Sequence, residues 1–485
     1  MDYILILEII YVIVLMLVCY RVIVDTQNTT KTLAYLLLVF FVPIIGMIIY
    51  FSFGVNYRIR KMYDKKLMTN ENLQLKLEKE LISYSKGVLK DGDGTVRENK
   101  KLVNLILKEN LSPLTNSNNV KLLINGEEKF PDVLEGIAHA KKHIHIEYYI
   151  FEDDNIGVQI IDLLLKKVAE GVVVRFIYDD FGSRSIRNKQ VKRLREGGVK
   201  VFPFYKIKLI AFANRINYRN HRKIIIIDGH TSFVGGINVS DRYINTEPNK
   251  NKVYWRDTHL KIVGPATWYL QYLFLCDWNF CAQDHMEINN ILFPDYQSFH
   301  SSQDKYVQIT ASGPDSDVPT IKFALLQAIN LAEKEVLITT PYFIPSNSIM
   351  DALLISAKSG VSVKLIVPDK SDSKLVNAAA CSYYEAMLKS GVEIYRYKKG
   401  FVHAKTLVID DEIAVVGTAN MDVRSFDLNF EVNAIIYDEE IANQLQKTFY
   451  EDLISTEKIE LEQWQNRSVF YKFLDKLARL FSPML

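Results

Sequence analysis

Residues 220–238 read NHRKIIIIDGHTSFVGGIN, and residues 402–420 read VHAKTLVIDDEIAVVGTAN. The two stretches share one spacing of chemically active residues, His-x-Lys-x4-Asp-x6-Gly-x-x-Asn. In both copies the preceding sequence alternates short β-branched runs with helical segments that end at a Gly-Val pair. This order is typical of α/β units, in which glycine ends the helix. The repeat therefore predicts two tandem, homologous α/β domains.

The spacing of histidine and lysine brings their side chains together, because alternate residues of a β-strand point to the same face. The predicted catalytic motifs are His221, Lys223, Asp228, His403, Lys405 and Asp410. The two aspartates end their strands, so within the motifs we expect them mainly to brace the structure. Each motif also ends in an asparagine, Asn238 or Asn420, whose amide can donate to an anion.

The two motifs together predict a site for a phosphate diester. Lysine and asparagine would bind the non-bridging oxygens, one histidine would attack phosphorus, and the other would protonate the leaving oxygen. The positive charges are built into the chain, so we expect neither a metal nor another cofactor. A zinc site would need three or four His, Cys or carboxylate ligands, and the paired lysines would oppose it.

The N-terminal region differs from the rest of the chain. The full chain has 485 residues and a formal charge of +2, which argues against a general nucleic-acid binder. Residues 3–24 and 33–53 are almost wholly apolar and approach the length of a membrane span. A basic stretch, YRIRKMYDKK at residues 57–66, follows the second segment. We therefore predict a two-helix transmembrane hairpin with the remaining chain in the cytoplasm.

The duplicated motif resembles the signature of the phospholipase D superfamily over residues 119–451. With the apolar hairpin, the closest resemblance is to the bacterial cardiolipin synthases of that superfamily. Further segments carry this likeness: HIEYYIFEDDNIG, YWRDTHLKIVGP, TPYFIPS and GTANMDVRSFDLNFEVN. One departure is Thr418, which stands where many members of the superfamily have serine. Its hydroxyl is retained, so we expect it to contact phosphate.

The resemblance also implies roles for individual residues. In the superfamily an acid orients each catalytic histidine, and Glu431 and Asp257 occupy the matching places here. We expect Glu431 to pair with His221 and Asp257 with His403. The resemblance favours His221 as the nucleophile and His403 as the general acid and then base. Candidates for the cavity wall are Tyr148, Tyr149, Tyr342, Phe343 and the insertion at residues 205–219, which only the first copy has.

These observations predict five regions. Residues 1–55 would form the two transmembrane helices, and residues 56–118 a juxtamembrane helical linker. Residues 119–300 and 301–450 would form the two phospholipase D-type domains, which share one active site. Residues 451–485 would form a C-terminal helical segment that either lies on anionic lipid or packs on the core.

The resemblance implies a bacterial plasma-membrane enzyme. It would transfer a phosphatidyl group from one phosphatidylglycerol to another, releasing glycerol and forming cardiolipin through a phosphohistidine. The expected partners are phosphatidylglycerol, other anionic phospholipids and the membrane, without nucleic acid. A phospholipase D that admits water is the alternative, followed by a membrane-tethered nuclease and a catalytically silent membrane-binding module. Oligomeric state does not follow from these patterns.

Overall fold

The computed structural model describes residues 3–26, 29–51, 71–206, 218–245, 253–282, 284, 286–295 and 303–482. Within these residues, fifteen strands form one sheet in the order β19-β13-β12-β10-β15-β16-β18-β9-β1-β8-β6-β5-β2-β3-β4. The basic stretch at 57–66 and most of the insertion, residues 207–217, lie outside the described residues.

The two halves of the sheet have the same topology. The first half consists of β1 (Thr115–Ile124), β2 (His143–Tyr148), β3 (Val173–Asp179), β4 (Lys200–Phe204), β5 (Lys223–Ile227), β6 (Thr231–Gly235) and β8 (Thr258–Val263). The second consists of β9 (Lys305–Ser312), β10 (Glu335–Thr339), β12 (Ser362–Pro368), β13 (Glu393–Tyr397), β15 (Thr406–Ile409), β16 (Ile413–Gly417) and β18 (Glu431–Tyr437), with β19 (Thr456–Lys458) added at the edge. In each half three strands are parallel, and the first strand of the motif hairpin, β5 or β15, pairs antiparallel with one of them, β2 or β10.

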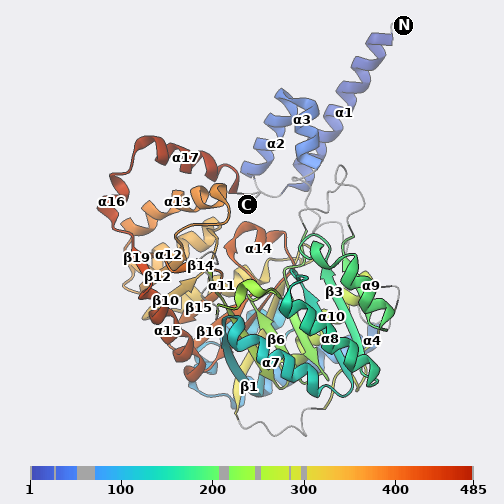
Figure 1. The fold of residues 1–485 in the computed structure, drawn as a ribbon. Helices are drawn as coiled ribbons and strands as arrows, with labels where there is room; N and C mark the ends of the chain where they lie inside the picture. Colours follow the sequence, from blue (N-terminus) through green and yellow to red (C-terminus); the bar gives the residue numbers. More distant parts are fainter. Residues whose placement is uncertain are drawn as a thin grey trace.

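The halves join through antiparallel pairing of β1 with β9, where Thr115 faces Val307. Helices cover both halves (Figure 1). In the first half they are α7 (Asn125–His139), α8 (Asn155–Ala169), α9 (Lys189–Glu196) and α10 (Thr267–Cys281). In the second half they are α11 (Thr320–Leu331), α12 (Asn347–Lys358), α13 (Lys374–Lys389), α14 (Val423–Asp427) and α15 (Glu439–Leu453).

A hydrophobic core is shared between the two halves. It contains side chains of α10 and α15 together with strands of both sheet halves, such as Val234 from β6 and Val432 from β18. Two further cores lie within the first and the second half respectively. The shared core fixes the two halves against each other, and this places both motifs at one junction.

The N-terminal region forms one long helix, α1 (Tyr3–Asp25), and two short ones, α2 (Thr29–Phe41) and α3 (Pro43–Ile49). Within the described residues only α1 is long and apolar enough to cross a membrane. The second predicted span is divided into α2 and α3 instead of forming one continuous helix. Proline disfavours helical backbone in the residue before it, and the chain turns at Val42 ahead of Pro43.

Helix α3 folds back along α2. The ring of Tyr50, next to α3, lies 5.6 Å from the ring of Tyr35 in α2. The Tyr50 hydroxyl lies 3.4 Å from Asp25, at the end of α1. At Gly46, any side chain would collide with the backbone of α2, since an added Cβ would lie 2.4 Å from the Leu38 oxygen. The end of α3 therefore lies close to the end of α1.

The predicted linker is helical, with α4 (Glu71–Asp91), α5 (Gly94–Glu98) and α6 (Lys100–Asn110). It is more than a spacer, however. Val96, Leu102 and Ile106 are fully buried in the core of the second half, where α6 packs on α11 and β9. This segment precedes the first domain in the sequence, but it packs into the core of the second domain.

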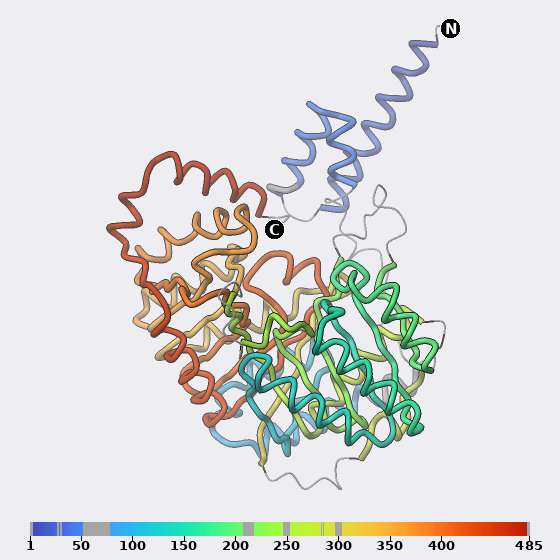
Figure 2. Tube along the Cα trace, viewed as in Figure 1, coloured from blue at the N-terminus to red at the C-terminus, as the bar shows by residue number. Residues whose placement is uncertain are grey.

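The C-terminal segment forms α16 (Leu461–Gln465) and α17 (Val469–Arg479). Helix α17 packs on α13. Figure 2 traces this segment to the same side of the molecule as α1–α3. The buried positions of α17 are the small or polar Asp475 and Ala478, whereas Phe470 and Phe473 are 64% and 60% exposed. The large apolar residues of α17 therefore do not serve as core, which argues against the core-packing alternative.

Candidate active site

The motif aspartates lie away from the reacting groups. The Asp228 carboxylate accepts hydrogen bonds from the backbone N–H groups of Lys141, Lys142 and His143, at distances of 2.6–2.9 Å. Asp410 accepts three equivalent bonds at the start of β10. Both aspartates have positive φ, +53° and +51°, at the turn of their hairpins. Both carboxylates therefore brace the fold, in line with their position at the strand ends.

The backbone around each histidine is bonded to the opposite domain. The His221 N–H donates to the Phe430 carbonyl at 2.9 Å, and the Phe430 N–H donates to the Arg219 carbonyl at 2.9 Å. The His403 N–H donates to the Arg256 carbonyl at 2.7 Å, at the end of the short parallel pair β7 (Tyr254–Arg256) and β14 (Gly400–Val402). Each histidine is thus held beside the residue that precedes the acid of the other domain.

His221 contacts Glu431 across the domain junction. Its Nδ1 lies 3.0 Å from Glu431 Oε1, and the carboxylate is completely buried. The amide of Asn429 lies 3.3 Å from the same Nδ1 and donates to Glu431 at 3.2 Å. The ring of Tyr149 packs against the imidazole at 4.1 Å between centroids. Burial lowers the pKa of His221, and Glu431 partly opposes this effect.

His403 contacts Asp257 in the same manner. Its Nδ1 lies 2.6 Å from Asp257 Oδ2, and that carboxylate is also completely buried. Lys405 Nζ lies 3.0 Å from the same Nδ1. Burial and the Lys405 charge lower the pKa of His403 to about 4, against the opposing effect of Asp257. The structure therefore places each acid against the histidine with which the resemblance paired it.

The two lysines are buried beside their histidines. Lys223 Nζ donates to the His221 carbonyl at 2.6 Å, and Lys405 Nζ donates to the His403 carbonyl. Burial lowers the pKa of Lys223 to about 8 and that of Lys405 to about 7. A buried ammonium gains stability from an anion placed next to it. Both side chains are thus suited to hold a phosphate that enters the site.

Side chains of both domains line a cavity of about 490 Å³. Its wall includes His221, Lys223, His403 and Lys405, and the predicted Asn238, Asn420, Tyr149 and Tyr342. Tyr148 and Phe343 are 1% exposed and pack in the hydrophobic cores instead. The two motifs therefore open into the same space.

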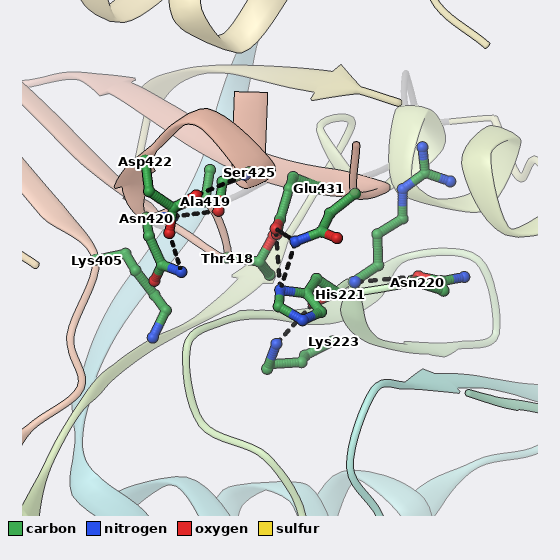
Figure 3. Close-up of polar contacts among 12 residues, drawn as sticks. Asn220, His221, Lys223, Lys405, Thr418, Ala419, Asn420, Asp422, Ser425 and Glu431 are labelled. Atoms are coloured by element: carbon green, nitrogen blue, oxygen red, sulfur yellow. Dashed lines mark hydrogen bonds and ion pairs between the residues drawn. The ribbon is translucent and has the colours of Figure 1, made fainter. Parts of the chain in front are cut away.

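The asparagine amides are partly engaged within the protein. Asn238 Nδ2 donates to the Tyr243 hydroxyl at 2.9 Å, and its Oδ1 accepts from the Ile150 N–H. Asn420 Nδ2 donates to Asp422 at 3.0 Å (Figure 3). Each Nδ2 carries a second hydrogen, so a bond to a bound anion remains chemically open.

Thr418 is placed differently from the prediction of a phosphate contact. Its side chain is completely buried, its Oγ1 donates to Glu431 Oε2 at 2.6 Å, and the same oxygen accepts from the Val432 N–H. It therefore holds the acid that holds His221 (Figure 3). The prediction considered only the retained hydroxyl, and its direction depends on the tertiary structure.

Several wall residues escaped the sequence reasoning. Asn429, Trp255 and Tyr243 contact the histidines, and Arg219 and Arg424 add positive charge to the wall. A signal existed in their positions, since each lies within a few residues of a motif residue or its acid. Beneath the first motif, Asn220 donates to the buried Glu147, a contact that has no counterpart at Val402 in the second motif.

Known protein families match both the duplicated domains and the N-terminal region of this chain. Residues 133–263 and 325–453 match the family described as "Cardiolipin synthase, PLD-like domain", and residues 9–54 match "Phospholipase_D-nuclease N-terminal". The major cardiolipin synthase ClsA of Bacillus subtilis (strain 168) is 41% identical over 466 residues, which cover 95% of both chains. The cardiolipin synthase of Oceanobacillus iheyensis is 40% identical over 461 residues, again covering 95% of both.

A solved structure supports the fold. The phosphatidylserine synthase of Haemophilus influenzae Rd KW20 superimposes with a TM-score of 0.56 at 16% identity. The superposition covers 81% of this chain and 98% of that one. At this level of identity the likeness concerns the fold alone.

Proposed function

Because this chain belongs to the cardiolipin synthases with a duplicated phospholipase D-like domain, we propose that it transfers a phosphatidyl group between two phosphatidylglycerol molecules. The products are cardiolipin and glycerol. The observation that carries the proposal is the crossed pairing of each histidine with a buried acid of the other domain, beside two ammonium groups in one cavity.

In the first step the donor phosphodiester lies between the two histidines, with its non-bridging oxygens on Lys223 and Lys405. The neutral Nε2 of His221 attacks phosphorus, and the bond to the glycerol oxygen breaks. His403 gives its proton to that oxygen, so glycerol leaves as a neutral alcohol. Glu431, on Nδ1, stabilises the positive charge that develops on His221.

In the second step a hydroxyl of the acceptor phosphatidylglycerol takes the place of the leaving glycerol. His403, now neutral, removes its proton, and the acceptor oxygen attacks the phosphorus bound to His221. The P–N bond breaks, cardiolipin forms and His403 regains its proton. One phosphodiester is exchanged for another, so no nucleotide is consumed.

The pKa of His403 near 4 applies to the empty site, where the imidazole is neutral at pH 7. The negative charge of a bound phosphodiester favours the imidazolium. Proton uptake by His403 is therefore part of donor binding. Until the donor binds, both histidines are neutral, and His221 is therefore nucleophilic.

Product analysis tests the proposed function. Purified enzyme with phosphatidylglycerol in detergent micelles should release glycerol and cardiolipin in equal amounts. Phosphatidic acid as the main product would instead identify a hydrolase, cut DNA a nuclease, and no product a binding module.

To test the roles of the histidines, a His403→Ala variant is given a nitrophenyl ester donor, which needs no acid. The His403→Ala variant should accumulate the phosphohistidine at position 221. If instead only the His221→Ala variant forms an adduct, and that adduct lies on His403, the roles of the two histidines are reversed.

We also infer the arrangement on the membrane. Helix α1 crosses the bilayer, α2 and α3 enter and return, and the catalytic domains lie in the cytoplasm, where the basic residues 57–66 favour them. The Tyr3 end of α1 then lies on the opposite side from the active site. A cysteine at position 4 should react with a membrane-impermeant maleimide in intact cells, whereas one at the exposed Lys192 should not. The reverse pattern of labelling would contradict this orientation.

Helix α17 would lie on the same cytoplasmic lipid surface. Its exposed large apolar residues are Val469, Phe470, Tyr471, Phe473, Leu474 and Leu477. Lys472, Lys476 and Arg479 accompany them, as suits an anionic interface. The supporting helix α13 begins beside Ser373 and carries Val376, both in the cavity wall. The lipid substrate would therefore enter the cavity from the surface on which α17 rests.

A further inference from the structure

One positively charged side chain of the cavity wall has no role in the two-histidine mechanism. The Arg219 side chain lines the cavity, yet the residue is only 3% exposed. Both terminal guanidinium nitrogens, Nη1 and Nη2, are buried and have no hydrogen-bond partner among the described residues. Burying a guanidinium without an anionic partner is costly. The position therefore indicates that an anionic ligand completes it.

Among the described residues, no carboxylate forms a hydrogen bond with these two nitrogens. Asp179 is the carboxylate that acts electrostatically on Arg219. Its oxygens already accept hydrogen bonds from the N–H groups of Phe181, Gly182 and Asn220, at 2.9–3.2 Å. The other cations of the first domain's wall are engaged: Arg242 pairs with Glu152 at 3.5 Å, and Lys223 bonds to the His221 carbonyl.

Arg219 is also held in place. Its carbonyl accepts the hydrogen bond from Phe430 that joins the two domains, and its guanidinium lies 4.5 Å from the centre of the Phe181 ring. Arg219 precedes His221 by two residues, and Asn220 between them forms a β-bridge with Phe430. The side chains of Arg219 and His221 therefore lie on the same face. In the second motif the corresponding residue is the buried Phe401, which carries no charge. The second motif thus has no counterpart of Arg219, and the additional cation of its domain, Arg424, comes from α14.

One phosphodiester carries a single negative charge, which the two lysines meet. The transfer reaction brings a second phosphodiester into the cavity, that of the acceptor lipid. We propose that Arg219 binds the phosphodiester of the acceptor phospholipid while Lys223 and Lys405 hold the donor phosphate. This inference rests on the proposed function, because a hydrolase has no second anionic substrate. Arg219 then determines specificity for an anionic acceptor over a neutral alcohol.

The test separates the acceptor from the donor. A nitrophenyl ester of phosphatidic acid serves as the donor in detergent micelles, and either phosphatidylglycerol or free glycerol serves as the acceptor. A charged hydrogen bond is worth enough that Arg219→Gln should raise the KM for phosphatidylglycerol about tenfold or more. The KM for glycerol should change much less, so the ratio of the two products shifts toward the glycerol adduct. Arg219→Lys should restore part of the preference.

Arg184 provides the matched control. It lies 4.0 Å from the same Phe181 ring but is exposed and outside the cavity wall. Arg184→Gln should keep the wild-type product ratio. An unchanged ratio in Arg219→Gln, or an equal loss with both acceptors, would overturn the inference. Wild-type enzyme that makes no cardiolipin would instead contradict the proposed function.

A measurement on the wild-type enzyme covers the case in which Arg219→Gln does not fold. Glycerophosphoglycerol is the head group of the acceptor without its acyl chains, and it carries the phosphodiester that glycerol lacks. If Arg219 binds that group, glycerophosphoglycerol should accept the phosphatidyl group with a KM about tenfold below that of glycerol. Equal KM values for the two soluble acceptors would contradict the inference.

Discussion

Glu431 of the second domain lies 3.0 Å from Nδ1 of His221 in the first domain. The reciprocal contact, from Asp257 of the first domain to His403 of the second, measures 2.6 Å. Neither domain therefore contains a complete histidine–acid pair of its own. Each half of the duplication therefore takes the acid for its histidine from the other half.

This crossing predicts strong non-additivity. His221→Ala and His403→Ala should each lower kcat by about a thousandfold or more, and the double variant should be scarcely worse, because the residues act as one unit. Initial rates of cardiolipin formation measure this. Half of the wild-type activity in either single variant would mean two independent sites.

Substitution of the acid beside a histidine should lower activity, whereas substitution of a motif aspartate should lower stability. Glu431→Gln should lower kcat about a hundredfold or more while it leaves the melting temperature close to wild type, because a neutral amide stabilises the His221 cation less. Asp228→Ala removes the acceptor of three backbone N–H groups. It should therefore lower the free energy of unfolding by about 2–4 kcal/mol. If enzyme with Asp228→Ala is fully folded and inactive, the bracing role is wrong.

The lysine pKa values predict the alkaline pH dependence. Lys405 and Lys223 have pKa values of about 7 and about 8 in the empty site, below the ordinary value for lysine. As pH rises from 7 to 9 the free enzyme loses these charges and kcat/KM should fall. The bound phosphodiester favours the ammonium, so kcat should fall only at higher pH. Lys405→Arg keeps its charge, and its kcat/KM should decline at higher pH than that of the wild type.

Activity should survive removal of divalent metal. Lys223 and Lys405 supply the positive charge that a metal would bring to the phosphate. Among the residues that the structure describes, no group of three or more His, Cys, Asp or Glu side chains is arranged to hold a metal ion. Turnover in micelles with excess chelator should stay within about twofold of the untreated rate. Complete loss that stoichiometric metal restores would contradict the metal-free mechanism.

Helix α17 should contact lipid in reconstituted vesicles. A nitroxide at position 473 should be accessible to oxygen and protected from a water-soluble relaxing agent, whereas one at Lys192 should show the opposite. Phe470→Ser with Phe473→Ser should lower the rate on vesicles about tenfold, because each exposed phenylalanine contributes transfer energy to the interface. The rate on short-chain, monomeric phosphatidylglycerol should be unaffected. Equal losses on both substrates would place α17 in the catalytic fold instead.

Much of the fold followed from local patterns. The identical spacing of residues 220–238 and 402–420 indicated two homologous α/β domains, and the likeness to known cardiolipin synthases confirms that relationship. The i, i+2 spacing of His221 and Lys223 placed both side chains on one face, because strand geometry alone determines that face. These features depend on residues close together in sequence.

Contacts between distant residues were decided by the tertiary structure. The sequence retained a hydroxyl at Thr418, but only the pairing of β16 with β18 turns it toward Glu431. Composition made residues 33–53 apolar enough to span a membrane, while the turn at Val42 and the packing of Tyr50 on Tyr35 fold α3 back along α2. In the sequence Arg219 only ends the insertion, whereas the structure places its buried guanidinium in the cavity wall, where its terminal nitrogens have no hydrogen-bond partner among the described residues. Spacing specifies which face a side chain occupies, but its partners depend on segments that packing brings from elsewhere in the chain.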